Sequence, residues 1–148
     1  MDSISQTRIA LVAPWAVKYG LDPLLTCAVC EQESQWQPFA VRFEPGFYTK
    51  YVSPQKLTDV TEAYCRAMSF GLMQIMGQTA REFGYQDKYL TQLCQSELGL
   101  EFGCKKLRAC FDKHNNDNET ALLAYNGGIN LEYAAEVLAR VPHYMGAS

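Results

Sequence analysis

The sequence predicts a mainly α-helical single domain with a small irregular or short-hairpin lobe around residues 38–56. Apolar residues recur at helical spacing over most of the chain, and capping residues and glycines divide these stretches. The exception is an aromatic, irregular segment around Pro45-Gly46. The length of 148 residues is close to the common size of one domain, and no linker or internal repeat is visible. We therefore treat residues 1–148 as one domain.

The N-terminal part of the chain carries two predicted helices. The first covers residues 4–19 and ends at Gly20. Asp22-Pro23 then supplies an N-cap followed by proline at the first helical position. The second helix is expected to run to about Trp36, because its apolar residues fit helical spacing better than alternation. One face of this helix is therefore expected to be buried.

The middle of the chain is expected to change character. From Pro38 to Pro54 it is rich in aromatic residues around Pro45-Gly46, which favours a folded excursion or a short hairpin over a helix. Glycines and the polar stretch Asn115–Asn118 separate the helices that follow. These helices are predicted at residues 58–67, 72–83, 92–114, 118–126 and 131–140.

Composition excludes several function classes. A hydrophobic fraction of 48% and a charged fraction of 20% are those of an ordinary globular protein. The formal net charge of -3 and the absence of a Lys/Arg run in the sequence argue against nucleic-acid binding, which needs a clustered basic surface. Any attraction to an acidic ligand must therefore come from a local groove and not from the field of the whole molecule.

The six cysteines are too few for a disulfide scaffold, and the Cys27-x-x-Cys30 pair lacks a second pair of ligands at zinc spacing. We therefore expect no metal site and no cofactor. Cys94, Cys104 and Cys110 lie among apolar residues, which favours small buried side chains.

An apolar stretch from Ile9 to Val17 is too short to cross a bilayer, so no stable membrane insertion is expected. It also makes a poor signal peptide, because Asp2 offsets Arg8, Pro14 interrupts the stretch and no cleavage motif follows. The expectation is synthesis in the cytoplasm without an export signal.

Three short motifs carry the chemistry: Glu33-Ser34, then Gly71-Leu72-Met73-Gln74 at the expected start of a helix, then Ala124-Tyr125-Asn126 followed by Gly127-Gly128. In this order they resemble the catalytic domain of soluble lytic transglycosylases, relatives of goose-type lysozyme, over about residues 22–140. The resemblance implies a lysozyme-like fold that cuts the glycan strands of peptidoglycan without a cofactor.

Glu33 is the expected catalytic residue. Cleavage of a glycosidic bond needs a proton on the leaving oxygen, and a buried carboxylic acid with a raised pKa can deliver it near neutral pH. Glu31 is the rival, but positions two apart on a helix point about 200° from each other, so the two carboxyls cannot face one cleft. The family motif assigns the acid to the glutamate directly before serine, which is Glu33.

The resemblance implies roles for the neighbouring motif residues. Ser34 is expected to support or orient the site, Gln74 to hydrogen-bond acetamido or hydroxyl groups of the substrate, and Met76 to line the sugar site. Gly71 is expected to let backbone and ligand approach closely. Leu72 and Met73 are expected to be packing residues.

The third motif is expected to complete the site. The Tyr125 phenol is expected either to hydrogen-bond the catalytic carboxyl or to lie beside the developing cation, with a half-buried structural tyrosine as the plain alternative. Asn126 is expected to fix the turn into Gly127-Gly128 and to contact substrate. His114 and His143 lack a nucleophile at a recognisable spacing and are expected at the surface or at helix ends.

The chain also departs from the usual family pattern. Met68 and Ser69 stand where glycine and alanine are common, and Gly77 stands where proline often follows. The segment Arg42-x-Glu44-Pro45 resembles that of phage-encoded lysins and is expected either to roof the groove or to pack the small lobe.

Three functions are compatible with these residues. The leading one is a monomeric lytic transglycosylase that forms 1,6-anhydromuramic ends on the cell wall or periplasmic peptidoglycan, acting as a phage or prophage endolysin. The second is a hydrolytic goose-type muramidase that uses Glu44, Asp59 or Glu62 to activate water. The third is a glycan-binding module without catalysis, against which the intact Glu33 argues.

Overall fold

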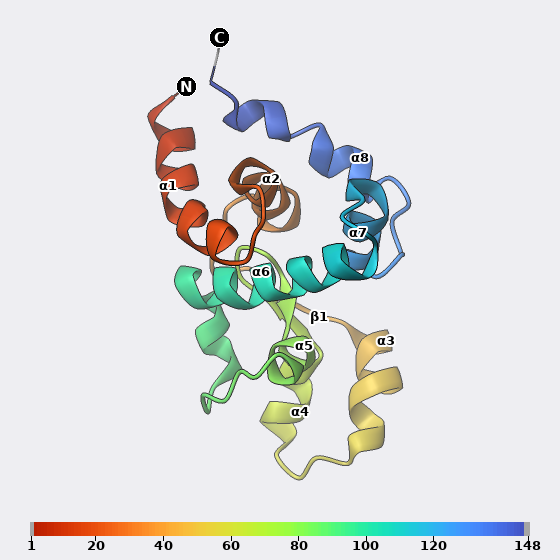
Figure 1. Cartoon of the computed structure of the whole chain (residues 1–148). Coiled ribbons are helices and arrows are strands. Elements are labelled where there is room, and N and C mark those ends of the chain that lie inside the picture. The colour runs from red at the N-terminus through yellow and green to blue at the C-terminus, as the bar shows by residue number, and fades with distance from the viewer. Residues whose placement is uncertain (1, 147–148) are drawn as a thin grey trace.

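The computed structural model describes residues 2–146, and helices make up most of it (Figure 1). Helix α1 spans Ser3–Lys18 and α2 spans Pro23–Ser34, which confirms both predicted helices with small differences at their ends. The predicted N-cap is confirmed, because the Asp22 carboxylate accepts a hydrogen bond of 2.8 Å from the Leu24 N–H. The α2 helix ends at Ser34 and not at Trp36, because the next two residues adopt positive φ angles of 51° and 64°.

The small lobe contains a three-stranded antiparallel sheet in the order β1-β2-β3. These strands are Val41–Phe43, Met68–Phe70 and Ile75–Met76. The prediction of a hairpin within residues 38–56 was wrong, because β1 pairs with β2 from beyond this segment.

Residues 45–55 form consecutive helical turns, which also corrects the prediction of an irregular segment. These turns are α3 (Pro45–Phe47), the π-helical η1 (Tyr48–Val52) and the 3-10 turn η2 (Ser53–Gln55). Proline at the first helical position starts the turns. The Tyr48 ring stacks on the ring of Tyr64 in α4, with 5.0 Å between the ring centres. The aromatic residues thus pack one helical segment against another.

The predicted helix over residues 72–83 begins only at Gly77. Residues 71–74 instead form a turn between β2 and β3, and α5 spans Gly77–Glu82. Gly71 and Gln74 adopt positive φ angles of 73° and 49°, which a right-handed helix cannot contain. An added Cβ at Gly77 would meet the Cys65 carbonyl oxygen at 2.3 Å, so the departure from the family pattern at this position is a packing requirement.

The remaining helices follow the prediction closely. They are α4 (Val60–Arg66), α6 (Ser96–Lys113), α7 (Asn118–Tyr125) and α8 (Tyr133–Leu138), with 3-10 turns η3 (Leu90–Cys94) and η4 (Val141–Tyr144). The predicted helix over residues 92–114 is interrupted at Gln95, whose backbone is extended.

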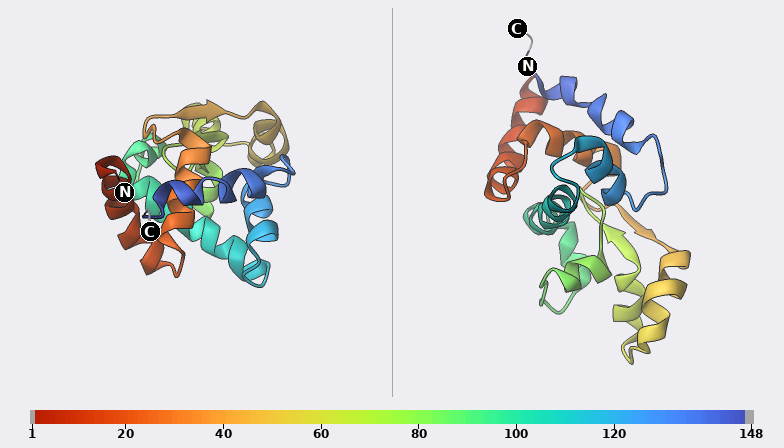
Figure 2. Two further views of the ribbon diagram at one scale, coloured as in Figure 1. Left: turned by 90° about the horizontal axis from the view of Figure 1, so that it is seen from above. Right: turned by 45° about the vertical axis from the view of Figure 1, so that its right-hand side comes forward.

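Helix α6 separates two packed regions of the molecule. In Figure 1, α1, α2, α7 and α8 lie above it, and the sheet with α3, α4 and α5 lies below; the right-hand view in Figure 2 shows the same division. The main core contains Leu100, Cys104 and Leu107 of α6, and a second core lies around Phe70 and Leu93. The groove described below lies where these two regions meet.

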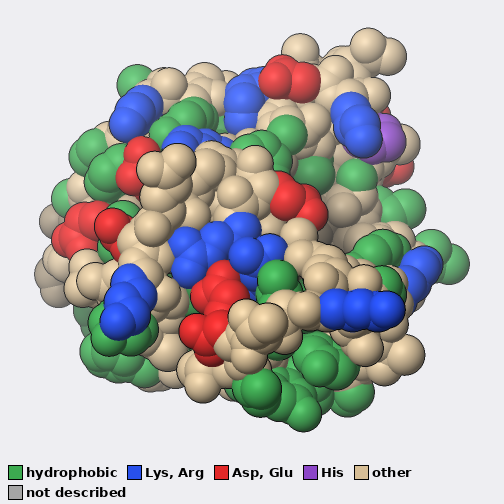
Figure 3. Space-filling model, turned by 90° about the horizontal axis from the view of Figure 1, so that it is seen from below, with side chains coloured by type: hydrophobic (Ala, Val, Ile, Leu, Met, Phe, Trp, Pro, Cys, Tyr) green, Lys and Arg blue, Asp and Glu red, His purple; other side chains and the backbone are tan. Residues whose placement is uncertain are grey.

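The lower face of the molecule belongs to the small lobe. Basic side chains gather there beside acidic ones, with hydrophobic side chains at the edge (Figure 3). An ion-pair network in this lobe joins Glu62 to Arg66 at 2.9 Å and to Arg81 at 2.8 Å. This network links α4 to α5 and so fixes the base of the lobe.

The cysteines of the chain are all free thiols. Cys27, Cys30 and Cys104 are buried, whereas Cys65, Cys94 and Cys110 are only partly buried. The expectation of a buried side chain is therefore confirmed for Cys104 and was wrong for Cys94 and Cys110. Within residues 2–146 no group of three His, Cys, Asp or Glu side chains is placed to hold a metal ion. None of the helices described is both long and apolar enough to span a membrane.

Candidate active site

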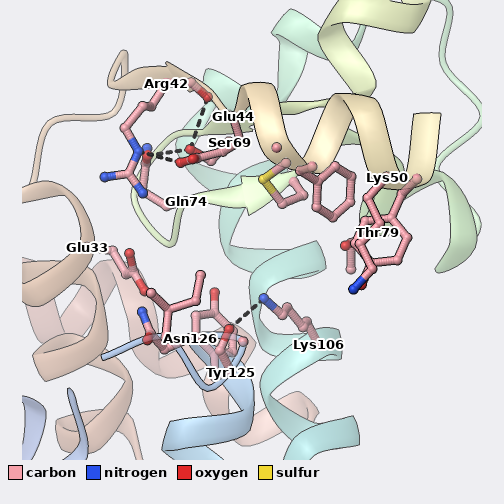
Figure 4. Close-up of a pocket in the computed structure, with 16 residues that line it drawn as sticks. Glu33, Arg42, Glu44, Lys50, Ser69, Gln74, Thr79, Lys106, Tyr125 and Asn126 are labelled. Atoms are coloured by element: carbon pink, nitrogen blue, oxygen red, sulfur yellow. Dashed lines mark hydrogen bonds and ion pairs between the residues drawn. The ribbon is translucent and has the colours of Figure 1, made fainter. Parts of the chain in front are cut away.

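A groove of about 680 Å³ lies between the main helical region and the small lobe. Glu33 of α2 lies at one end of this groove (Figure 4). One wall comes from α3 and η1, and the opposite wall comes from the end of α7 and the loop after it. The groove is therefore within the usual size range of ligand pockets and is lined by segments from distant parts of the sequence.

Glu33 has the environment of a proton donor. Burial raises the pKa of its carboxyl, although the hydrogen bond from Tyr133 and the positive charges of Lys106 and Arg42 lower it. The pKa is raised overall, so the protonated carboxyl persists to higher pH than that of an exposed glutamate. This arrangement suits general acid chemistry.

Tyr133 is the direct partner of Glu33, and sequence reasoning missed it. Its hydroxyl donates a hydrogen bond of 2.6 Å to the Glu33 Oε1, and its side chain is buried. Tyr133 begins α8, a helix that the sequence did predict, but no motif marked this tyrosine. A buried tyrosine near the start of a helix gives no signal of the carboxyl that it contacts one hundred positions away.

Glu31 faces away from the groove, as the helical geometry predicted. Its carboxylate accepts hydrogen bonds from the Tyr144 hydroxyl at 2.5 Å and pairs with the His143 ring at 3.0 Å. Partial burial raises the pKa of Glu31, but these hydrogen bonds outweigh that effect and the pKa is lowered overall. The pKa values of the two α2 glutamates are therefore shifted in opposite directions. The expected position of His143 at the surface is confirmed.

Ser34 supports the site without lining it. Its buried hydroxyl donates to the Cys30 carbonyl at 3.0 Å and to the Leu72 carbonyl at 2.9 Å, and so lies between α2 and the 71–74 turn. Leu72 and Met73 are buried core residues, as expected. The serine that follows Glu33 therefore fixes the turn relative to α2.

Gly71 and Gln74 hold the turn in shape. An added Cβ at Gly71 would meet the Leu93 carbonyl oxygen at 2.8 Å, so backbone packing requires this glycine, and its expected close approach to a ligand stays a prediction. The Gln74 amide lines the groove, but it donates to the carbonyls of Ala40 and Gly71 at 3.0 Å each and accepts from Ser69 at 2.7 Å. Gln74 thus joins the turn to the sheet, and its expected contact with substrate stays a prediction.

Tyr125 closes the bottom of the groove. Its hydroxyl donates to the Met73 carbonyl at 2.6 Å and not to the Glu33 carboxyl, so the first of its two expected roles is not seen. Lys106 of α6, which sequence reasoning also missed, donates to the Tyr125 carbonyl at 2.7 Å and lies 4.2 Å from the centre of its ring. Tyr125 therefore connects the turn, α7 and the lysine.

Asn126 and Met76 both line the groove, as the resemblance implied. The Asn126 side chain accepts a hydrogen bond of 2.8 Å from the Asn130 N–H, which closes the loop after α7. Gly127 and Gly128 have positive φ angles of 80° and 75°, so this turn depends on glycine. The expected turn-fixing role of Asn126 is thus seen in the structure.

The acidic residues named for the hydrolytic alternative lie in different places. Glu44 lines the groove, but its carboxylate pairs with Arg42 at 2.6 Å. Asp59 caps α4 by accepting from the Glu62 N–H at 3.0 Å, and Glu62 is held by arginines of α4 and α5. Neither Asp59 nor Glu62 lines the groove.

The family comparison matches nearly the whole chain. The model of the transglycosylase SLT domain matches residues 10–138, somewhat more than the sequence motifs indicated. No solved structure matches the chain.

Proposed function

Because the chain belongs to the transglycosylase SLT domain family, whose members are lysozyme-like lytic transglycosylases that degrade peptidoglycan, we propose that Glu33 is its single catalytic acid and base. The bond cut is the β-1,4 bond between N-acetylmuramic acid and N-acetylglucosamine. The observation that carries this proposal is the partly buried Glu33 carboxyl, which lies at the end of the groove, accepts a hydrogen bond from Tyr133 and has a raised pKa.

The reaction uses the same carboxyl twice. Protonated Glu33 gives its proton to the glycosidic oxygen as the bond from that oxygen to C1 of the muramic acid breaks and positive charge develops on the ring. The Glu33 carboxylate then takes the proton from the 6-hydroxyl of the same sugar as that oxygen bonds to C1. The acid is restored, a 1,6-anhydro ring is formed, and no water is consumed.

The arrangement of Tyr133 supports this cycle. The carboxylate that forms after the first proton transfer lies in a partly buried position, where an unpaired charge is costly. A hydroxyl already placed at 2.6 Å and the nearby positive charges of Lys106 and Arg42 reduce that cost. The carboxyl can therefore alternate between its two forms within one turnover.

Hydrolysis by a muramidase mechanism is the second candidate, and one observation favours it. Glu44 is a second carboxylate that lines the groove and is therefore the only one of the three named candidates in reach of a bound strand. Its Oε1 already accepts a hydrogen bond of 2.6 Å from the Arg42 Nε, so this oxygen is not free to accept one from an attacking water. Transglycosylation is therefore the better-supported outcome.

Product analysis separates the two outcomes. Purified peptidoglycan is digested, and the released muropeptides are identified by mass spectrometry. We expect 1,6-anhydromuramic ends, lighter by one water than the hydrolysis product and without a reducing terminus. Reducing muramic ends as the main species would establish the muramidase mechanism and make Glu44→Gln the next variant. A protein that binds the walls without releasing fragments would be the non-catalytic module.

We also propose a role as a phage or prophage endolysin. The Arg42-x-Glu44-Pro45 segment that resembles phage lysins forms part of the groove wall. The test is expression inside a bacterial host with and without a co-expressed membrane pore protein. Rapid lysis that depends on the pore would support this role, and equal lysis with and without the pore would contradict it.

A further inference from the structure

The side chains that line the groove carry more positive than negative charges, unlike the chain as a whole. The chain has a formal net charge of -3, yet the groove is lined by three basic and two acidic side chains. Arg42 and Glu44 neutralise each other at 2.6 Å, and burial raises the pKa of Glu33. The charges without a neutralising partner are those of Lys106 and Lys50.

Lys106 is a partly buried cation, and some of its N–H donors have no hydrogen-bond partner within residues 2–146. One of its three N–H donors goes to the Tyr125 carbonyl at 2.7 Å. Across residues 2–146, no carboxylate lies within ion-pair distance of this ammonium group. Burial lowers the pKa of Lys106, although Cys110 and Glu33 raise it. An ammonium group that is partly removed from water is stabilised by any anion that enters the groove beside it.

Lys50 lies on the opposite wall of the groove. It is exposed, its ammonium group is 5.0 Å from the centre of the Tyr51 ring, and no carboxylate of the described chain pairs with it. In Figure 4, Lys106 lies between Glu33 at one end of the pocket and Lys50 at the other. The two lysines thus line the part of the groove along which a strand would extend from the cleavage point.

We propose that Lys106 and Lys50 form a carboxylate-binding subsite that selects acidic muramyl units of the strand. This inference rests on the proposed function and adds the substrate preference. In a strand of alternating sugars, only N-acetylmuramic acid carries carboxylates, either on its own lactyl group or on the attached stem peptide. A neutral strand of N-acetylglucosamine offers none, so the subsite distinguishes peptidoglycan from chitin-like glycans.

The test measures binding separately from cleavage. Glu33→Gln protein, which is expected not to cut, is titrated calorimetrically with three ligands of equal length: an N-acetylglucosamine oligomer, a peptide-free muramyl fragment with lactyl carboxylates, and the same fragment bearing stem peptides. We expect at least one acidic ligand to bind about tenfold more tightly than the neutral one, a typical effect of a charge-assisted hydrogen bond. This preference should shrink as salt is added.

Two lysine variants and a matched control locate the subsite. Lys106→Met and Lys50→Met, each in the Glu33→Gln background, should lose most of the preference for the acidic ligand. Lys105→Met should keep it, because Lys105 is the neighbour of Lys106 on α6 but lies over the Phe102 ring, 4.4 Å from its centre, and does not line the groove. Lys50 is exposed, so its variant tests the subsite even if Lys106→Met fails to fold.

Each result has one meaning. Equal affinity for acidic and neutral oligomers, or an unchanged preference in both lysine variants, would overturn the subsite and leave the proposed function standing. Preference for the lactyl ligand or only for the peptide ligand identifies which carboxylate is bound. If the wild-type protein released no muropeptides from walls, the proposed function would fail, whatever the oligomers show.

Discussion

Replacing Tyr133 by phenylalanine removes one hydroxyl and leaves the ring in place. That hydroxyl donates to Glu33 Oε1 at 2.6 Å, and the structure of residues 2–146 gives it no second partner. The side chain is 2% exposed, so water has little access to replace the lost donor. A hydrogen bond to a charged group is worth about 1.5 to 3 kcal/mol, which corresponds to a rate loss of about 10- to 150-fold if it acts in the transition state.

The same variant should change the pH dependence in a defined direction. Burial raises the pKa of Glu33, and the hydrogen bond from Tyr133 lowers it. Removing that bond leaves the raising effect less opposed, so the pKa of Glu33 rises further. Because the alkaline limb of kcat/KM reports the essential acid of the free enzyme, this limb should move to higher pH even as the maximal rate falls.

The assay is the initial rate of muropeptide release from purified walls across a pH series. Tyr125→Phe is the matched control, because its hydroxyl donates to the Met73 carbonyl and not to Glu33. It should leave the alkaline limb in place. A Tyr133→Phe protein with the wild-type rate and an unmoved alkaline limb would refute the assignment of Glu33 and Tyr133 as a functional pair.

Glu33→Gln should lower wall lysis by at least about two orders of magnitude with an unchanged fold, whereas Glu31→Gln should matter little; equal losses of turbidity-clearing activity would contradict this. Gln74→Ala should raise the activation free energy and lower the free energy of unfolding by about 1 to 3 kcal/mol each, since the amide holds the turn beside the groove. Steady-state kinetics and urea unfolding measure the two values separately, and a change in only one of them would contradict this. Gly103→Ala should destabilise the fold by about 1 to 3 kcal/mol, because its Cβ would meet the Met73 Sδ at 2.5 Å; an unchanged urea midpoint would show that the core repacks freely.

Local sequence signals predicted the features that depend on neighbouring residues. The Asp22 cap, the extent of α1 and the opposite directions of Glu31 and Glu33 follow from the geometry of a single helix. The motifs also placed Glu33, Met76 and Asn126 at one groove although they are far apart in sequence. That step relied on the family resemblance, because helical periodicity alone gives no distance between helices.

The wrong predictions share a physical cause. Apolar residues at 72 and 73 fit a helix in isolation, but Gly71 lies against the Leu93 carbonyl and adopts a positive φ that only the packed structure requires. The aromatic segment after β1 likewise gains its helical turns from packing on α4. Local propensity is a weak preference that tertiary packing overrides.

The sequence by itself determined the helical class and the Asp22 cap, because these depend on residue type and on spacing along one helix, and its family motif singled out Glu33 as the proposed acid. Only the tertiary structure decided the partners of that acid. Tyr133 and Lys106 lie 100 and 73 positions from Glu33, and neither belongs to a motif. The pKa of a carboxyl is set by burial and by charges a few ångströms away, and those neighbours exist only once α2, α6 and α8 pack together.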